Sequence, residues 1–359
     1  MNYRKAVLLE AESIATAATK TIDLDLQDLI SRITLFVMVT NTSYIPAGHP
    51  ADCITLIEIV DGSEVLYSLT GVEAQALSYY NNGVMDRNEL NYENVGSCRA
   101  AITLNFGRYL YDELFALDPN KYRNLQLRVT HNKALGGCTP TAGTLKVTAD
   151  LFDEKVAMPG GFLSGKEIFG FTPVAGAAEY IIIPTDQTIR MLMPINTNDN
   201  EEPDIEFETI KIDEDNGKRT ILDCATLDLI NDEANMFPCF TEFLSGRVGT
   251  GGEEFYVSAC KDIMLGVSGC SGNAAYYHGA WSGGRLRSIK GSATYEFSGN
   301  TSGRCPHGGV PIFFGKRNEP DDWWDVSRIG QARVILTPRL SSTDGNKTTR
   351  LVGQFARKY

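Results

Sequence analysis

Cysteine and histidine are the side chains best suited to bind zinc. The chain has 359 residues, among them eight cysteines and four histidines, and its C-terminal half brings Cys260, Cys270, His278, Cys305 and His307 into one stretch. Compact zinc motifs place two ligands a few residues apart as a pair, whereas this sequence contains no C-x-x-C pair. We therefore interpret the cysteines as free, partly buried thiols of a reducing compartment, with a zinc site as the weaker alternative.

Oxygen ligands suited to calcium gather in two acidic loops, at residues 198–202 and 213–215. Neither loop has the ligand order or the central glycine of an EF-hand, so we expect two solvated loops. Trp323 and Trp324 follow two aspartates and can stack on a sugar. Adjacent tryptophans more often anchor packing or a subunit contact, and we favour that role.

The familiar catalytic motifs are absent from the sequence. It has no glycine-rich phosphate loop after a strand, no nucleophile elbow and no metalloprotease helix. Sandwich hydrolases take their two carboxylates from separate strands, and nothing singles out such a pair. We therefore predict that the chain is not an enzyme. We expect no catalytic, cofactor-binding or metal-binding residues, no cofactor and no small-molecule substrate.

Composition indicates a globular chain long enough for two domains, with 43% hydrophobic and 22% charged residues. The net charge of −12 argues against a protein that binds nucleic acid over its whole surface. Charge is uneven, because residues 199–215 are strongly acidic and residues 328–359 are basic. We interpret both segments mainly as solvated surface, and the basic one as a candidate contact with a genome or a lipid surface.

No segment approaches the roughly 20 apolar residues that span a bilayer. Residues 1–20 make a poor signal peptide, since Glu10 and Glu12 interrupt a brief apolar run. We predict a short amphipathic helix there, packed on its own domain or on a neighbouring subunit. A helix lying on a membrane surface is the alternative.

The stretch from Ile54 to Asn82 predicts a hairpin followed by a helix. Two apolar runs flank a turn at residues 61–63, where glycine tolerates a positive φ. Thr70 is the expected N-cap, with Glu73 as its capping-box partner, and Gly83 ends the helix.

This pattern recurs in the second half of the chain. Residues 210–231 again predict a hairpin and a short helix, and the two turn glycines, Gly62 and Gly217, are 155 residues apart. Upstream, residues 33–41 match 189–197, and the apolar segment 22–26 corresponds to 180–183. The order strand, strand, hairpin, helix therefore occurs twice, which indicates a duplicated domain.

Short apolar runs between turn residues predict antiparallel sandwiches. In the first half we expect strands at 22–26, 33–40, 54–60, 64–69, 100–106, 124–132 and 143–150, and a brief helix at 109–117. In the second half we expect strands at 179–183, 188–195, 204–212, 218–222, 255–258, 263–267, 285–297 and 331–340. Residues 158–177 are interpreted as a linker, and residues 85–98 and 266–316 as long loops. The predicted domains are an N-terminal helical segment 1–20, a first sandwich 21–165 and a second sandwich 166–359.

At this point the chain resembles the double jelly-roll major capsid proteins of icosahedral tailless viruses, particularly those of bacteria. The resemblance rests on four segments, namely residues 54–76, 162–193, 333–340 and 354–359. It implies an all-β fold of two consecutive eight-stranded antiparallel jelly rolls with short inserted helices. It also implies a virion shell protein made in the host cytoplasm. Three copies would form a pseudo-hexagonal capsomer that contacts neighbouring capsomers and minor capsid proteins. A genome or an internal membrane would be contacted through the N-terminal helix or the basic C-terminal segment.

Two other functions stay open. Some glycan-cleaving amidases carry two adjacent jelly rolls with a site in the groove between them, and Glu167, Glu179 and Asp186 lie near the predicted linker. The aromatic residues of 266–316 would suit a glycan-binding spike or tail protein instead. We favour the capsid hypothesis over both.

Overall fold

The computed structural model describes residues 1–198, 201–248, 253–270, 282–287, 295–339 and 348–359. Its first half forms an eight-stranded jelly roll, because the two facing sheets have the interleaved strand order of that fold. One sheet contains, in order, β1 (Tyr3–Ser13), β9 (Ala142–Phe152), β3 (Ile30–Thr40) and β7 (Ser97–Asn105). The other contains β2 (Ala18–Asp23), β8 (Leu125–His131), β4 (Ile54–Asp61) and β5 (Glu64–Leu69).

The second half repeats the same strand order. One sheet contains β10 (Gly161–Phe171), β22 (Thr349–Lys358), β12 (Thr188–Ile195) and the short β20 (Ile312–Phe313). The other contains β11 (Glu179–Ile183), β21 (Ala332–Thr337), β13 (Thr209–Glu214) and β14 (Arg219–Ala225). The prediction of two consecutive eight-stranded jelly rolls is therefore confirmed.

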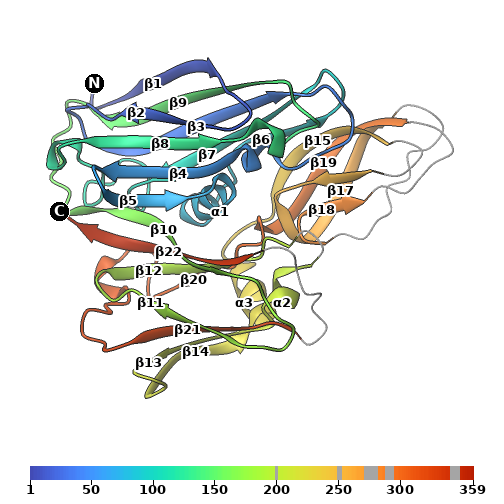
Figure 1. Ribbon diagram of the computed structural model, residues 1–359. Coiled ribbons are helices and arrows are strands. Elements are labelled where there is room, and N and C mark those ends of the chain that lie inside the picture. Colours follow the sequence, from blue (N-terminus) through green and yellow to red (C-terminus); the bar gives the residue numbers. More distant parts are fainter. Residues whose placement is uncertain (199–200, 249–252, 271–281, 288–294, 340–347) are drawn as a thin grey trace.

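The two rolls share a continuous sheet, since β5 of the first runs parallel to β10 of the second and pairs with it at Ser68 and Lys166. The strands of both rolls run in nearly the same direction (Figure 1). Helix α1 (Gly71–Asn82) lies where the two rolls meet, with most of its residues buried. Thr70 and Glu73 form its capping box, and Gly83 ends it in the left-handed conformation at φ 72°. These three predictions are confirmed.

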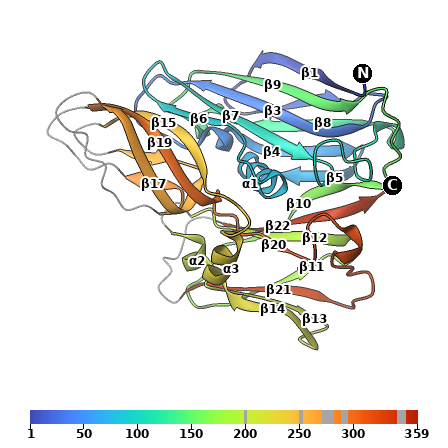
Figure 2. The ribbon, with the colours of Figure 1, turned by 180° about the vertical axis from the view of Figure 1, so that it is seen from behind.

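An insert separates α3 (Thr226–Glu233) from β20. It consists of β15 (Phe240–Val248), β17 (Ala259–Cys270), β19 (Tyr295–Pro306), and the small pair β16 (Glu254–Tyr256) and β18 (Arg285–Arg287). Strand β15 runs parallel to β6 (Asn88–Tyr92), so the insert extends a sheet of the first roll. The insert projects from one end of the molecule, while both chain termini lie at the opposite end (Figures 1 and 2).

The predicted N-terminal helix is wrong. Residues Tyr3–Ser13 form the edge strand β1, paired along its length with β9, and residues Ala18–Asp23 form β2. A short amphipathic segment fits either a helix or a strand, and here the hydrogen bonds offered by β9 decide between them. Both strands belong to the first jelly roll, so residues 1–20 are not a separate segment. No helix of the described residues is long and apolar enough to cross a membrane.

The helix predicted at 109–117 is also wrong, because this segment is an irregular loop with Tyr111 at φ 60°. The loop contacts both ends of the chain: Tyr111 stacks on Tyr3 at 4.0 Å between ring centroids, and the backbone of Asp118 donates to the Tyr359 hydroxyl. Phe115 stacks on Trp323 of the second roll. Its shape is set by these distant partners and not by local helix propensity.

Several predicted loops and strands need correction. The linker at 158–177 contains β10, so the predicted boundary at residue 165 falls inside a strand of the second roll. The loop at 85–98 contains β6, and that at 266–316 contains the end of β17, then β18, β19 and β20. The strand predicted at 204–212 begins instead as α2 (Pro203–Glu206) before β13.

Candidate functional site

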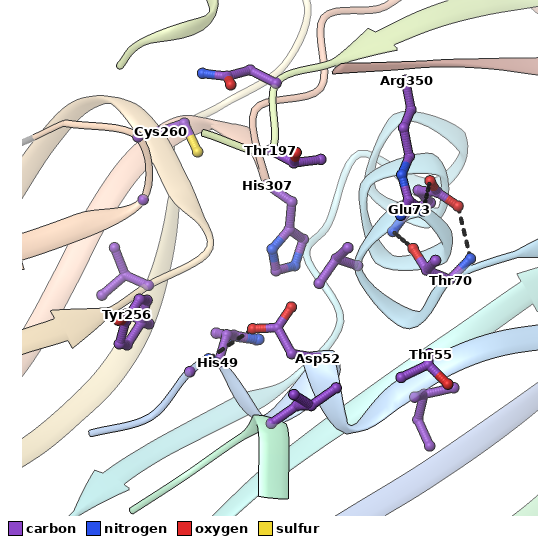
Figure 3. A pocket seen from close by; sticks show the side chains of 18 of the residues that line it. His49, Asp52, Thr55, Thr70, Glu73, Thr197, Tyr256, Cys260, His307 and Arg350 are labelled. Atoms are coloured by element: carbon purple, nitrogen blue, oxygen red, sulfur yellow. Dashed lines mark hydrogen bonds and ion pairs between the residues drawn. The ribbon is translucent and has the colours of Figure 1, made fainter. Parts of the chain in front are cut away.

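A pocket of about 600 Å³ lies where the two rolls and the insert meet. The first roll supplies the short helix η1 (Pro50–Cys53) with its N-cap His49, and the start of α1. The insert supplies Tyr256 and Cys260, and the second roll supplies Arg350. Figure 3 shows the His307 ring pointing into the space between these elements. The pocket therefore brings together histidine, carboxylate and hydroxyl groups, the side-chain types from which nucleophilic active sites are built.

His49, Ser258 and Glu242 form the arrangement that most resembles a catalytic triad. Ser258 Oγ lies 3.1 Å from His49 Nε2 and 2.6 Å from Glu242 Oε1. However, His49 Nδ1 accepts a hydrogen bond from the backbone N–H of Ala51 as the cap of η1. A neutral His49 ring therefore has its proton on Nε2, and Ser258 donates its own proton to Glu242. The histidine has no lone pair for the serine proton, so the serine is not activated as a nucleophile.

Glu242 is a buried carboxylate in ionised form. Its side chain is 3% exposed and accepts hydrogen bonds from Asn88 Nδ2 at 2.7 Å and from Ser258 N at 2.8 Å, as well as from the serine hydroxyl. Burial alone would raise its pKa, but the bonds from His49, Ser258 and Asn88 outweigh burial and lower the pKa to about 2. This carboxylate is held as a hydrogen-bond acceptor and is not available as an acid.

The same hydrogen bonds continue to His307. Gln75 Nε2 donates to Asn88 Oδ1 at 2.8 Å, and Gln75 Oε1 lies 2.8 Å from His307 Nε2. Burial, followed by the nearby His49, lowers the pKa of His307 to about 3, so this ring is neutral near pH 7. We call the connected set the buried polar network; it consists of His49, Gln75, Asn88, Glu242, Ser258 and His307.

The buried polar network connects the first roll to the insert. His49, Gln75 and Asn88 come from the first roll, Glu242 and Ser258 come from the insert, and His307 directly follows β19 of the insert. A satisfied buried network specifies one arrangement of the elements it joins. Its geometry therefore points to a structural role, which is to fix the insert on the first roll.

On the opposite side of the pocket, Glu73 links the first roll to the second. Its Oε2 accepts from the Thr70 backbone at 2.7 Å, and its Oε1 accepts from Arg350 Nη1 at 2.9 Å. Arg350 also lies 3.4 Å from Glu167. One Glu73 oxygen thus caps the start of α1, and the other holds α1 against β22.

Of the residues considered for zinc, the structure describes the side chains of Cys260, Cys305 and His307. Cys260 and Cys305 are buried thiols, and burial raises the pKa of each well above its ordinary value, which disfavours the thiolate that binds metal. The Cys270 side chain and His278 lie outside the described residues. Within the described part of the chain, no three His, Cys, Asp or Glu side chains are placed to hold a metal ion.

The acidic and aromatic candidates are engaged in packing. Asp213 pairs with Arg333 at 2.7 Å, and Glu214 accepts from the Trp324 indole at 2.9 Å. Trp323 is 4% exposed, so neither tryptophan forms a sugar platform. In the other acidic loop, residues 199–200 lie outside the described part.

The three acids near the predicted linker belong to different parts of the second roll. Glu167 is in β10, Glu179 is in β11 of another sheet, and Asp186 lines a separate polar pocket beside Arg357. They do not form a carboxylate pair.

The sequence does not reveal the buried polar network, because its contacting members are separated by up to 232 positions, as in the contact of Gln75 with His307. The only local signal was the cap of η1, where His49 precedes a proline at the first helical position and Asp52 completes a capping box.

The outer face of the sheet β11-β21-β13-β14 is exposed and partly apolar. Tyr180 and Ile182 project from β11 with 59% and 64% of their surface exposed. Ile335 lies opposite Tyr180 on β21, and Arg333 packs over the Tyr180 ring at 5.5 Å. Large apolar side chains exposed together on a sheet are typical of a protein contact.

Known proteins resemble this chain in structure and not in sequence. No protein-family model and no curated protein matches the sequence. Solved structures match over the whole length. The STIV MCP has 10% sequence identity and a TM-score of 0.61, covering 100% of this chain and 98% of that chain. The major capsid protein P2 from Bacteriophage PM2 has 9% identity and a TM-score of 0.56, covering 99% and 98%. PBCV-1 VP54, fitted into a reconstruction of the virophage Sputnik, has 11% identity and a TM-score of 0.57, covering 99% and 93%. The chain therefore has the double jelly-roll fold of these proteins.

Proposed function

We propose that this chain is a major capsid protein, the structural subunit of an icosahedral virion shell. The observation that supports this most is the arrangement of the two rolls, which lie side by side with aligned strands and one shared sheet. The likeness to capsid proteins extends over both rolls and nearly all of the chain. The polar groups of the pocket are used in internal hydrogen bonds, which favours a structural role, and we expect no enzymatic activity.

We further propose a homotrimer. One chain contributes two similar blocks, so three chains around a three-fold axis give a ring of six blocks that can tile a shell. In such a ring the second roll of one copy must contact the first roll of the next. The exposed face with Tyr180 and Ile182 belongs to the second roll and is not covered by the residues that the structure describes, and we assign it to this contact.

The two ends of the molecule differ, as a shell subunit requires. The insert lies at one end and the two termini lie at the other (Figure 1). We place the insert on the outside of the shell and the termini on the inside. Contact with neighbouring capsomers and minor capsid proteins follows from the same proposal.

An internal contact with genome or membrane through an N-terminal helix no longer applies, because that segment is β1. The basic C-terminal segment stays a candidate, although Arg350 and Arg357 already pair with Glu73 and Glu64. A trimer map that places residues 350–359 on the outer surface would contradict this orientation.

The first test is the mass of the purified chain in solution, measured by light scattering at two salt concentrations. The chain has a mass of 39.4 kDa, and we expect a stable species of about three times that value. Electron microscopy should then show larger assemblies. A chain that stays monomeric at high concentration and forms no shell would overturn the proposal.

A further inference from the structure

Arg190 is a fully buried arginine at the junction of the two rolls. It sits in an irregularity of β12, where Ile189 pairs with Phe355 and Met191 pairs with Gln354, so Arg190 has no partner residue on β22. A bulge of this kind redirects a side chain. The side chain is 0% exposed and reaches Asn81 at the end of α1.

All the acceptors around Arg190 are neutral. Its Nη1 donates to the side-chain oxygens of Asn81 and Gln354, and its Nε donates to the backbone oxygen of Arg317 at 3.0 Å. No ion pair within 4.0 Å among the described residues involves Arg190 or Arg317. A buried guanidinium without an acid partner is costly, because arginine does not lose its proton to avoid the charge.

Three buried donors in this cluster have no hydrogen-bond partner within the described chain. They are Arg190 Nη2, Gln354 Nε2 and Arg317 Nε. The orientation of the Gln354 amide is fixed, since its oxygen accepts from Arg190. Buried polar atoms are nearly always satisfied in folded proteins, so these three donors require an explanation.

The charges that face this cluster leave it positive. Arg108 is also close, but it forms a two-point pair with Asp112 at 2.6 and 2.7 Å, which uses that carboxylate. Glu233 faces Arg317 beyond ion-pair distance; its Oε2 is buried without a hydrogen-bond partner among the described residues, and burial raises its pKa to about 7. Burial and the neighbouring Arg317 lower the pKa of Arg190 to about 9. A bound negative charge would relieve both effects.

Aromatic rings cover part of the cluster but do not replace an acceptor. Arg190 Cζ lies 5.9 Å from the centre of the Phe313 ring and 5.7 Å from that of Trp323. Arg317 Cζ lies 4.7 Å from the centre of the Phe237 ring. Such contacts stabilise a cation, yet a ring face is only a weak hydrogen-bond acceptor.

We propose that a small monovalent anion of the halide class binds among Arg190, Arg317 and Gln354. Complete burial of Arg190 excludes an acidic side chain of a partner protein, which could not reach the site. The anion joins β12 to β22 and to the loop after β20, and Arg190 connects it to Asn81 of α1 in the first roll. Because it binds the folded chain only, it stabilises the fold in proportion to its concentration over its dissociation constant.

The test is thermal unfolding of the full-length chain at constant ionic strength, with sodium chloride replaced stepwise by sodium gluconate. We expect the melting temperature to rise by a few degrees with chloride and to saturate. Crystals grown in bromide should show an anomalous peak beside Arg190. A melting temperature that is independent of chloride, or bromide crystals without a peak, would overturn the proposal.

A substitution gives an independent result. Gln354→Glu places a carboxylate on Arg190, so we expect this variant to lose the chloride dependence. Gln27→Glu adds the same charge at an exposed position and should keep it. A Gln354→Glu protein that still responds to chloride like the parent chain would contradict the site. If that variant fails to fold, the bromide peak in the parent chain decides.

Discussion

Glu73 and Arg350 lie 277 positions apart in the sequence, yet Arg350 Nη1 is 2.9 Å from Glu73 Oε1. Glu73 is the capping-box residue at the start of α1, and Arg350 belongs to β22, the last strand of the chain. Glu73 therefore caps the first turn of a helix in the first roll and also binds the last strand of the second roll. The contact joins local helix formation to the packing of the two rolls.

Glu73→Gln should destabilise the chain by about 1–3 kcal/mol, because it removes the charge of a carboxylate that is 1% exposed and paired with Arg350. Chemical denaturation measures the loss. Glu319→Gln is the matched control. Both Glu319 and its partner Lys316 are exposed, so removing this ion pair should change the stability of the chain by less than about 1 kcal/mol. Equal losses in the two variants would show that the Glu73 pair has no special role.

Acid should destabilise the chain through Glu242. Its folded pKa of about 2 lies below the ordinary value of 4.5, so its contribution is complete above pH 4.5 and is lost as the pH falls toward 2. In this window the free energy of unfolding should fall by up to about 1.4 kcal/mol per pH unit. Glu242→Gln should flatten the stability profile between pH 4.5 and 2. An unchanged slope in that variant would mean that another group is responsible.

His307 should lower the stability of the chain at a higher pH than Glu242 does. Because its folded pKa is lowered to about 3 from 6.5, the unfolded chain binds the proton first, and stability falls as the pH drops below 6.5. The ring is only partly buried, so we expect a slope below about 1.4 kcal/mol per pH unit. His307→Asn suits the left-handed backbone at φ 53° and should remove the slope between pH 6.5 and 4.5. Urea unfolding midpoints at half-unit pH steps measure this pH dependence. If the His307→Asn variant keeps the same dependence, His307 is not its source.

Ile182→Glu should weaken the proposed trimer without unfolding the chain. Ile182 is 64% exposed on the outer face of the second roll, so a charge there costs the monomer little but opposes burial against another copy. Light scattering should show a shift toward the monomer mass, with an unchanged melting temperature for the isolated chain. Val174→Glu, at a loop residue that is 59% exposed, is the control and should assemble normally. Normal assembly of Ile182→Glu would place the subunit contact elsewhere.

The sequence by itself determined the parts whose signals are local. The hairpin and helix at Ile54–Asn82 were predictable because turn residues, the Thr70 cap and Gly83 act within a few positions. The repeat in the second half was detectable for the same reason, and it corresponds to the matching strands β2 to β5 and β11 to β14. The repeat indicated two sandwiches, whereas the jelly-roll strand order was implied by the resemblance to capsid proteins and is confirmed by the structure.

Only the tertiary structure decided the rest, because the determining partners are distant in the chain. Residues 3–13 form a strand since β9 offers them a ladder, and residues 161–171 form a strand since β22 does the same. The buried polar network depends on contacts such as His49 with Ser258, 209 positions apart. The buried charge of Arg190 depends on an irregular pairing of β12 with β22. Hydrogen bonds between distant strands and the burial of charge are set by the assembled fold, and no local sequence pattern encodes them.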